Sequence, residues 1–153
     1  RIDDRGNVVF PHSDAQGLSG YELKNVTFNG FSSRGEKTLW QSNVFPTDTR
    51  LVIAESAIDA MSYYQLKSDE KTRYASTGGA LGPQQRPAIR DAILALGATG
   101  TVILAFDNDE AGEGLAEEVR SLVALGNFVR STPKKLKDWN DVLRAGLGLL
   151  PKS

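Results

Sequence analysis

Acidic side chains stand directly after two apolar runs of this sequence. Glu55 follows the run at residues 51–54, and Asp107 and Asp109 follow the run at residues 102–106. In an open α/β sheet, ligands bind outside the carboxyl ends of the strands, so chemistry is expected at these positions. If the two runs form neighbouring strands, about 4.8 Å apart, the three carboxylates converge. Oxygen ligands without cysteine suit Mg²⁺ or Mn²⁺, and a cation relieves repulsion among acids, so the sequence predicts a divalent metal site.

The same aspartates also have a purely structural interpretation. An Asp-x-Asp at a strand end is common in turns, and Asp109 is placed to cap the helix that follows. The presence of Glu55 at a second strand end favours the metal site over this alternative. Asp59 remains open, because it either serves only as a cap in the first helical turn or reaches the acidic cluster from there.

The elements that hold these acids form two parts. Residues 1–48 are glycine-rich, and short apolar alternation at 21–23 and 26–28 predicts a small β region with a bulge or bend at residues 24–25. Farther along, short continuous apolar runs alternate with segments of helical period, which is typical of a buried parallel sheet with crossover helices. The predicted strands lie at residues 51–54, 73–75, 102–106 and 127–129.

Helices are predicted after these strands. Ser56 is placed to cap the first, and Pro83 opens a second that Gly97 ends. A third is expected at 110–125 and a short last one at 140–144. The predicted fold class is therefore α/β, with a four-stranded parallel sheet flanked by helices and a small N-terminal β appendage.

Length and composition exclude several classes of protein. The 153 residues, 40% of them hydrophobic, support one globular core. We divide the chain into a β-rich segment at 1–48, a core at 49–146 and a C-terminal tail at 147–153. The longest apolar runs are far shorter than the roughly 20 residues of a membrane-spanning helix. Because the chain has no cysteine, it has no disulfide or thiolate zinc site, and a reducing, cytoplasmic setting fits best.

The charge balance limits the partners. Eighteen Lys and Arg against 19 Asp and Glu give a net charge of −1, and the pI is near 5.9. This is not the electrostatic pattern of an autonomous nucleic-acid binder, so any contact with nucleic acid must be local. Since the first residue is Arg1 rather than Met, we expect the chain to be a piece of a longer protein.

The acidic motifs resemble those of the toprim domain, which bacterial primases, topoisomerases and certain nucleases share. The resemblance rests on Glu-x-x-x-Asp at residues 55–59 and on Ala-Phe-Asp-Asn-Asp-Glu-Ala-Gly at 105–112, and it covers residues 50 to about 145. It implies a Rossmann-like toprim fold that binds Mg²⁺, in which Glu55, Asp107 and Asp109 are the functional acids. Asp59 matches an aspartate that follows the motif glutamate in primases.

Further segments favour the primase branch of that family. Residues 9–14, 20–22 and 39–40 resemble the β segment that leads into the toprim core of bacterial and plasmid primases. Ser56 replaces the glycine that replicative primases usually carry, which is closer to plasmid, phage and mobilisation proteins. The run at residues 137–141 resembles the late acidic motif of toprim primases and implies that Asp138 is a further metal ligand or supports one.

Two more groups have both a functional and a structural interpretation. Gly78 and Gly79 follow the second core strand and precede a helix, so they either bind phosphate or form a flexible turn. A lysine cluster either meets a phosphate backbone or triphosphate, or is only a solvated face. We interpret Trp139 as a packing residue and His12 as structural. The cluster consists of Lys134, Lys135 and Lys137.

The expected function is Mg²⁺-dependent nucleotidyl transfer by a primase-like replication or mobilisation protein. The resemblance implies a single-stranded DNA template, nucleoside triphosphates and other domains of the parent chain as partners, with no membrane. It also implies two metal ions, with a glutamate such as Glu55 handling a proton. The isolated fragment should be almost inert. Two alternatives stay open, a toprim nuclease that hydrolyses DNA phosphodiesters and a non-catalytic interaction module, whereas no tyrosine sits in a context that favours a topoisomerase.

Overall fold

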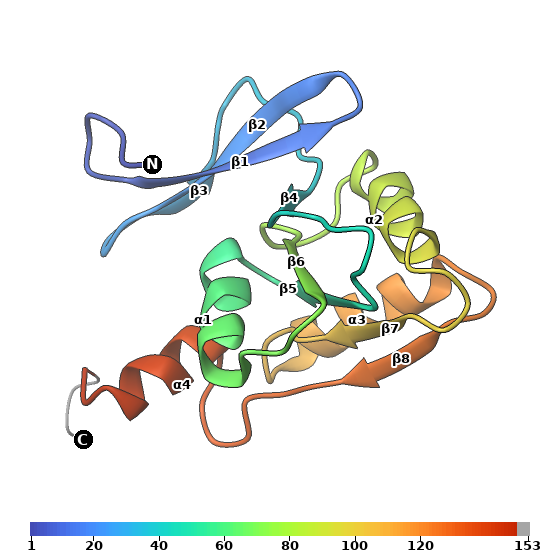
Figure 1. Ribbon diagram of the computed structural model, residues 1–153. Coiled ribbons are helices and arrows are strands. Elements are labelled where there is room, and N and C mark those ends of the chain that lie inside the picture. The colour runs from blue at the N-terminus through green and yellow to red at the C-terminus, as the bar shows by residue number, and fades with distance from the viewer. Residues whose placement is uncertain (150–153) are drawn as a thin grey trace.

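The computed structural model describes residues 1–149 and contains two β-sheets (Figure 1). The N-terminal sheet is antiparallel and has the order β1-β2-β3; the core sheet has the order β4-β6-β5-β7-β8. Within the described residues, no helix is both long and apolar enough to cross a membrane. Residues 150–153 of the predicted C-terminal tail lie outside the described residues. The strands of the N-terminal sheet are β1 (Val8–Asp14), β2 (Gly17–Lys24) and β3 (Asn29–Phe31).

The parallel strands of the core sheet overlap the four predicted strands, although the one predicted at 102–106 ends at Leu104. Apolar residues are continuous at 51–54 and 102–104 because helices cover both faces of the sheet there. The middle strand of the five is completely buried at Leu51, Val52 and Ile53. The four strands run parallel to one another and are β5 (Arg50–Ala54), β6 (Thr72–Ser76), β7 (Thr101–Leu104) and β8 (Asn127–Arg130).

A fifth strand corrects the predicted count of four. β4 (Trp40–Gln41) pairs antiparallel with β6 at one edge of the core sheet. Residues 39–40 carry a resemblance to a β segment of primases, but a two-residue strand is too short for a periodic pattern that would assign it to the core sheet. β4 precedes the boundary predicted at residue 48, yet it belongs to the core sheet. The N-terminal segment is thus joined to the core by strand pairing.

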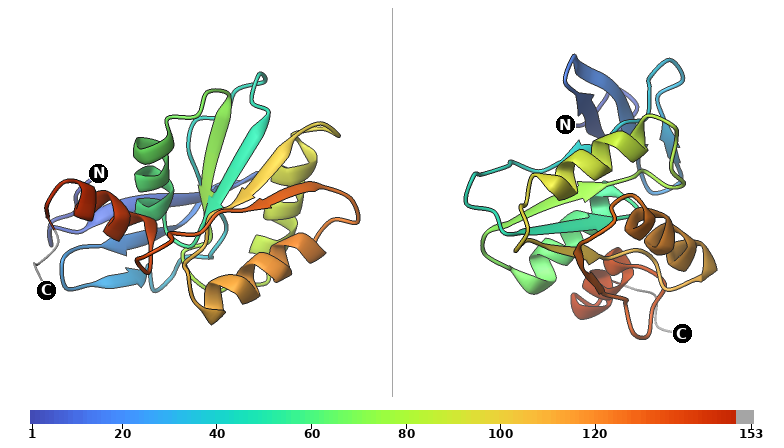
Figure 2. Two further views of the ribbon diagram at one scale, coloured as in Figure 1. Left: turned by 90° about the horizontal axis from the view of Figure 1, so that it is seen from below. Right: turned by 90° about the vertical axis from the view of Figure 1, so that its right-hand side faces the viewer.

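The helices cover the two faces of the core sheet in pairs. The left view of Figure 2 shows α1 and α4 on one side of the sheet and α2 and α3 on the other. Their apolar side chains form one core cluster on each face. The helices are α1 (Ala57–Lys67), α2 (Gln85–Leu94), α3 (Glu110–Ser121) and α4 (Trp139–Gly146).

The helix boundaries follow local capping chemistry. The Ser56 hydroxyl accepts a hydrogen bond from the Asp59 amide, so the predicted cap of α1 is confirmed. α2 begins two residues after Pro83, which lies in the preceding turn. Helix α3 ends at Ser121, earlier than predicted, while α4 is longer than the predicted span of 140–144.

The N-terminal sheet packs over the core and buries polar side chains there. The bend expected at residues 24–25 is the turn between β2 and β3, in which the Asn25 side chain accepts hydrogen bonds from two backbone N–H groups. The bulge lies in β1, between His12 and Ser13. His12 and Glu22 are both buried between this sheet and the core. This interface forms one wall of the site described next.

Candidate functional site

The carboxyl ends of β5 and β7 bring the predicted acids to one edge of the sheet. These strands pair in parallel, with Ile53 opposite Leu104. Glu55 follows β5 directly, and Asp107 comes three residues after β7. They line a pocket of about 190 Å³, whose lining residues come from both sheets and from the loop before α4. These residues are Glu22, Lys24, Asn29, Glu55, Ser56, Asp59, Gly78, Gly79, Asp107, Lys137 and Asp138.

The strand-end carboxylates retain free lone pairs. Oε2 of Glu55 and Oδ1 of Asp107 are buried and accept no hydrogen bond from any residue in 1–149. Burial, and then the nearby charge of Glu55, raises the pKa of Asp107 to about 7. Burial and then the charge of Asp109 also raise the pKa of Glu55. Buried polar atoms normally have partners, so these two carboxylates are prepared for a positive ligand.

The other predicted acids begin helices. Oδ1 of Asp109 accepts a hydrogen bond from the Gly112 amide at 2.9 Å, and Oδ1 of Asp138 accepts one from the Asp141 amide at 2.7 Å. Asp109 is partly exposed and stands beside the pocket rather than in its lining. The capping interpretation of Asp109 is therefore correct, whether or not its second oxygen also binds a ligand.

Asp59 combines the two roles that the sequence leaves open. Its carboxylate accepts hydrogen bonds from the Ser56 hydroxyl and, at 3.0 Å, from the Asn140 amide. It thereby links the start of α1 to α4 and also lines the acidic pocket. Burial is the main cause that raises the pKa of Asp59, with the charge of Asp138 adding to it.

Gly112, at the end of the acidic motif at residues 105–112, has a packing function. A Cβ atom on Gly112 would lie 2.1 Å from the backbone oxygen of Asp107, so no larger residue fits without a shift of the backbone. The first turn of α3 therefore packs directly on the strand end that carries the acid. This close approach explains why glycine follows the Asp-x-Asp at that spacing.

Only one lysine of the predicted cluster reaches the acids. Nζ of Lys137 lies 3.6 Å from an oxygen of Asp107 and 3.6 Å from an oxygen of Asp109. The charges of these two aspartates raise the pKa of Lys137. Lys134 and Lys135 are exposed and do not line the acidic pocket. Lys134 instead borders a separate hollow next to Trp139.

A metal ion must complete its coordination here with other oxygens. Among residues 1–149, no three acidic or histidine side chains are grouped closely enough to hold a metal ion as they stand. The unpartnered oxygens of Glu55 and Asp107 nevertheless fit a hard cation, because Mg²⁺ is usually held by one or two carboxylates plus water and substrate phosphates.

The N-terminal sheet contributes residues that the sequence analysis missed. Glu22 is 2% exposed, and its Oε2 accepts hydrogen bonds from the Ala57 amide and the Ser76 hydroxyl, both at 3.2 Å. Lys24 and Asn29 also line the pocket. The signal for Glu22 was present in the Gly-Tyr-Glu segment at residues 20–22. Only the docking of the two sheets assigns it to the site.

Two residues interpreted as structural occupy buried positions, where neither ring nitrogen of His12 nor Nε1 of Trp139 has a hydrogen-bond partner among residues 1–149. His12 is completely buried, stands edge-on to Phe31, and lies 3.8 Å from the carboxylate of Glu22. Trp139 is 5% exposed and packs edge-on against Tyr63. It is therefore unavailable as a platform on which a base stacks.

The predicted glycine turn forms another wall of the pocket. Gly78 and Gly79 have φ values of +62° and +92°, which L side chains rarely adopt. The Gly79 amide donates to the backbone oxygen of Glu55 at 2.9 Å, so the turn holds the end of β5. Nearby, Nζ of Lys37 donates to the Ala80 carbonyl at 2.9 Å, and burial lowers the pKa of Lys37.

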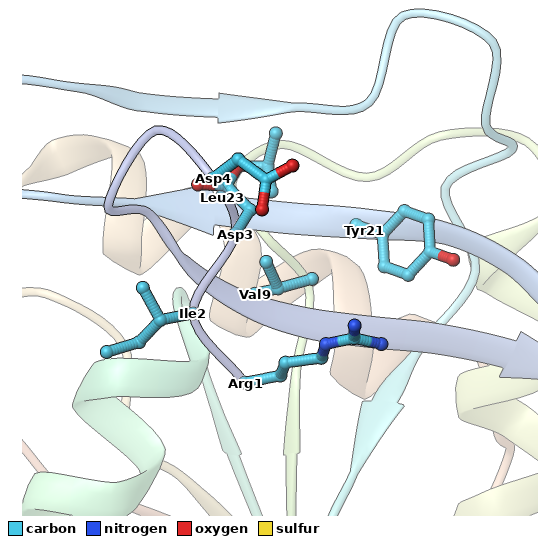
Figure 3. A pocket seen from close by; sticks show the side chains of 7 residues that line it. All are labelled: Arg1, Ile2, Asp3, Asp4, Val9, Tyr21 and Leu23. Carbon is cyan, nitrogen blue, oxygen red and sulfur yellow. The ribbon is translucent and has the colours of Figure 1, made fainter.

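A second hollow, on the outer face of the N-terminal sheet, has a different character. Figure 3 shows Val9, Tyr21 and Leu23 in its lining, with aspartates at one end. Its volume is about 390 Å³, larger than that of the acidic pocket. Hydrogen bonds from Asn7 satisfy the Asp3 carboxylate and lower its pKa. Asp3 therefore lacks the unpartnered, buried oxygens of the acidic pocket.

A family model described as Toprim-like matches residues 52–143, a span that contains all five predicted acids. The chain belongs to the Toprim-like family. A protein of Zymomonas mobilis subsp. mobilis, described as a 65 kDa protein, is 32% identical to this toprim chain over 172 residues. The match covers 97% of this chain but 28% of that protein. The chain thus spans just over a quarter of this relative's length.

Solved primase structures share the fold of this toprim domain. The primase fragment of the bacteriophage T7 primase-helicase protein matches with a TM-score of 0.63 at 19% identity, over 92% of this chain and 58% of that one. The RNA polymerase domain of Mycobacterium tuberculosis primase DnaG matches with a TM-score of 0.54 at 17% identity, over 97% and 56% respectively. The predicted primase-like toprim fold, including an N-terminal β region, is confirmed.

Proposed function

We propose that this toprim domain binds Mg²⁺ at the ends of β5 and β7 and carries out primase-like nucleotidyl transfer within a longer protein. One observation carries the proposal: Glu55 and Asp107, on adjacent parallel strands, bury carboxylate oxygens that no described residue satisfies. Leaving such groups unpaired costs free energy, and a site that binds a cation explains why the fold tolerates that cost.

The acids of the pocket have distinct functions in this proposal. Glu55 and Asp107 hold the metal ion, and Asp109, Asp59 and Asp138 surround it with further negative charge. A bound Mg²⁺ supplies positive charge that stabilises the phosphoryl group in the transition state. Glu55, whose pKa is raised by burial, would take the proton of a primer 3′-hydroxyl as that oxygen bonds to the α-phosphorus of an incoming nucleoside triphosphate and pyrophosphate leaves.

The rest of the pocket supports phosphate binding. Lys24 and Lys137 line it, and the turn at Gly78 and Gly79 brings backbone close to the acids. Among the structures with this fold, one contains T7 primase domains bound to an RNA/DNA hybrid and dTTP, and one contains the M. tuberculosis domain with a double-stranded DNA oligomer that has a 6-nucleotide overhang. With a net charge of −1, this domain relies on other parts of its parent chain to hold the single-stranded template.

The test uses the full-length protein with a single-stranded DNA template, nucleoside triphosphates and Mg²⁺. We expect short oligonucleotides, and we expect Glu55→Gln and Asp107→Asn to reduce their synthesis by about 10²-fold or more. Asp4→Asn is the matched control, since this exposed acid lies in the outer hollow and should leave synthesis unchanged.

Other outcomes would contradict the proposal. Metal-dependent cleavage of DNA that is lost in the same variants, without synthesis of oligonucleotides, would identify a toprim nuclease. If substitution of both acids leaves the activity of the parent protein unchanged, this domain is instead a non-catalytic interaction module. Synthesis that survives Asp107→Asn would show that these strand-end acids are not the reaction centre.

A further inference from the structure

A lysine occupies the place where positive charge is needed in the acidic site. Nζ of Lys137 is equally distant, at 3.6 Å, from Oδ2 of Asp107 and Oδ2 of Asp109. Within residues 1–149, it is the one basic group whose nitrogen lies within 4.0 Å of either carboxylate. The nearest arginine, Arg130, donates to the backbone oxygen of Asp107 and pairs with Glu113. Lys137 is therefore the counter-ion of this aspartate pair.

The backbone of Lys137 is fixed, whereas its side chain is free to move. The Asn108 amide donates to the Lys137 carbonyl at 2.9 Å, which ties the loop before α4 to the Asp-Asn-Asp motif. The Lys137 side chain is 64% exposed, and among residues 1–149 its ammonium group forms ion pairs with these two aspartates alone. Its flexible four-carbon stem can move the charge by several ångströms while the loop stays in place.

We propose that Lys137 neutralises Asp107 and Asp109 in the metal-free protein, that an incoming divalent cation displaces its ammonium group, and that the released group then binds a phosphate of the substrate. The inference rests on the proposed function, because it requires the metal ion to bind these acids. It assigns to Lys137 two successive partners, a carboxylate pair and then the phosphate group of a nucleotide.

Electrostatics favours this exchange. The ammonium group contacts Oδ2 of Asp107, while Oδ1 of the same carboxylate is the unpartnered oxygen that a cation would bind. The two positive charges would then stand only several ångströms apart and repel each other. Once a metal ion neutralises the acids, the ammonium group loses its attraction to them. Lys137 still lines the pocket, so the phosphate groups of a metal-bound nucleotide lie within reach of its donors.

The proposal predicts effects of opposite sign for one substitution. Lys137→Gln removes the competitor, so the substrate-free protein should bind Mn²⁺ about tenfold more tightly, which corresponds to about 1.4 kcal/mol. The same substitution should weaken binding of a non-hydrolysable nucleoside triphosphate about threefold to tenfold at saturating Mg²⁺. If Lys137 only bound the substrate phosphate, its substitution would weaken triphosphate binding without changing the affinity for Mn²⁺.

The experiment is an Mn²⁺ titration of the full-length protein followed by electron paramagnetic resonance. Binding at this site is the part of the signal that Asp107→Asn removes. Lys135→Gln is the matched control, because it makes the same change of charge at an exposed lysine outside the pocket. Its Mn²⁺ affinity should stay within about twofold of the wild type.

The possible failures are distinguishable. If the wild type shows Asp107-dependent Mn²⁺ binding and Lys137→Gln binds equally or more weakly, the inference about Lys137 is wrong while the metal site stands. If Mn²⁺ binding tightens but triphosphate affinity is unchanged, transfer of the ammonium group to phosphate is wrong. If Asp107→Asn does not reduce Mn²⁺ binding, both the inference and the proposed metal site are wrong.

Discussion

The acids at the strand ends and the acids at the helix starts lie in one cluster but differ in their bonding. Glu55 and Asp107, which follow β5 and β7, each bury an oxygen that has no partner among residues 1–149. Asp109 and Asp138, which precede α3 and α4, each accept a backbone N–H of the following helix. Proximity to a pocket therefore does not by itself identify a functional acid. Among the acids of this cluster, a buried oxygen without a partner separates the two groups.

The two groups have opposite effects on folding. A helix cap satisfies a backbone donor and places negative charge at the positive end of the helix, so it stabilises the fold. A buried carboxylate without a partner destabilises the fold whenever it is ionised. The cluster therefore combines acids that maintain the structure with acids that the structure tolerates. Substitutions in each group test this contrast.

Asp107→Asn should stabilise the metal-free protein at pH 8. Because the pKa of Asp107 is about 7 in the folded state and 3.8 as its ordinary value, ionisation removes stability as pH rises between these values. We expect a gain of about 2–4 kcal/mol at pH 8 from a shift of this size, and almost none at pH 3.5, where the carboxyl is mostly protonated in both states. Urea unfolding with EDTA at the two pH values measures this. A loss of stability at pH 8 would show that Asp107 is a structural acid.

Glu22→Ala should destabilise the protein, in contrast to the strand-end substitution. It removes the acceptor of the Ala57 amide and of the Ser76 hydroxyl in a buried interface. We expect a loss of about 2–3 kcal/mol in the free energy of unfolding. Glu36→Ala, at an exposed site, is the control and should stay within about 0.5 kcal/mol of the wild type. Equal effects of the two substitutions would mean that Glu22 does not anchor the sheets to each other.

Asp138→Ala and Asp138→Asn should separate capping from charge. Alanine cannot accept the bond from the Asp141 amide, so we expect a loss of about 1 kcal/mol in chemical denaturation. Asparagine is as good a cap as aspartate and should preserve stability while removing one negative charge from the pocket. If asparagine destabilised as much as alanine, the charge rather than the hydrogen bond would be the stabilising feature.

The smallest expected effect comes from the counter-ion. In EDTA at pH 8, Lys137→Ala should lower stability by about 0.2–1 kcal/mol, since its ammonium group is exposed and solvent screens the ion pair. Lys135→Ala, which lacks an acidic partner within the described residues, should have a smaller effect. Raising the salt concentration should reduce the difference between the two variants. A difference that persists in 1 M salt would indicate that packing rather than charge accounts for it.

Much of the site was predictable because it depends on local patterns. Continuous apolar runs identified the parallel strands, and the carboxyl ends of neighbouring parallel strands must share an edge, which brought Glu55 close to Asp107. The cap at Ser56 was readable from spacing alone. The resemblance of the motifs to the toprim domain also followed from the residues as they stand.

Contacts between distant segments could not be predicted, because no local sequence pattern indicates them. β4 is too short for any periodic pattern, and its pairing with β6 depends on how the N-terminal segment returns to the core. Glu22 enters the site only because the two sheets pack against each other. Nothing in the lysine cluster distinguishes Lys137 from Lys134 and Lys135 until the loop before α4 is fixed in space.

Hydrophobic periodicity and strand direction are local properties, so the sequence alone indicated the core helices, the parallel strands and the edge at which Glu55 meets Asp107. The tertiary structure then decided which carboxylates are satisfied, since the partners of Asp59 and Glu22 are remote in sequence. It also decided that Lys137 lies between the two aspartates. Satisfaction of buried polar groups is set by packing between distant segments, and no local pattern encodes it.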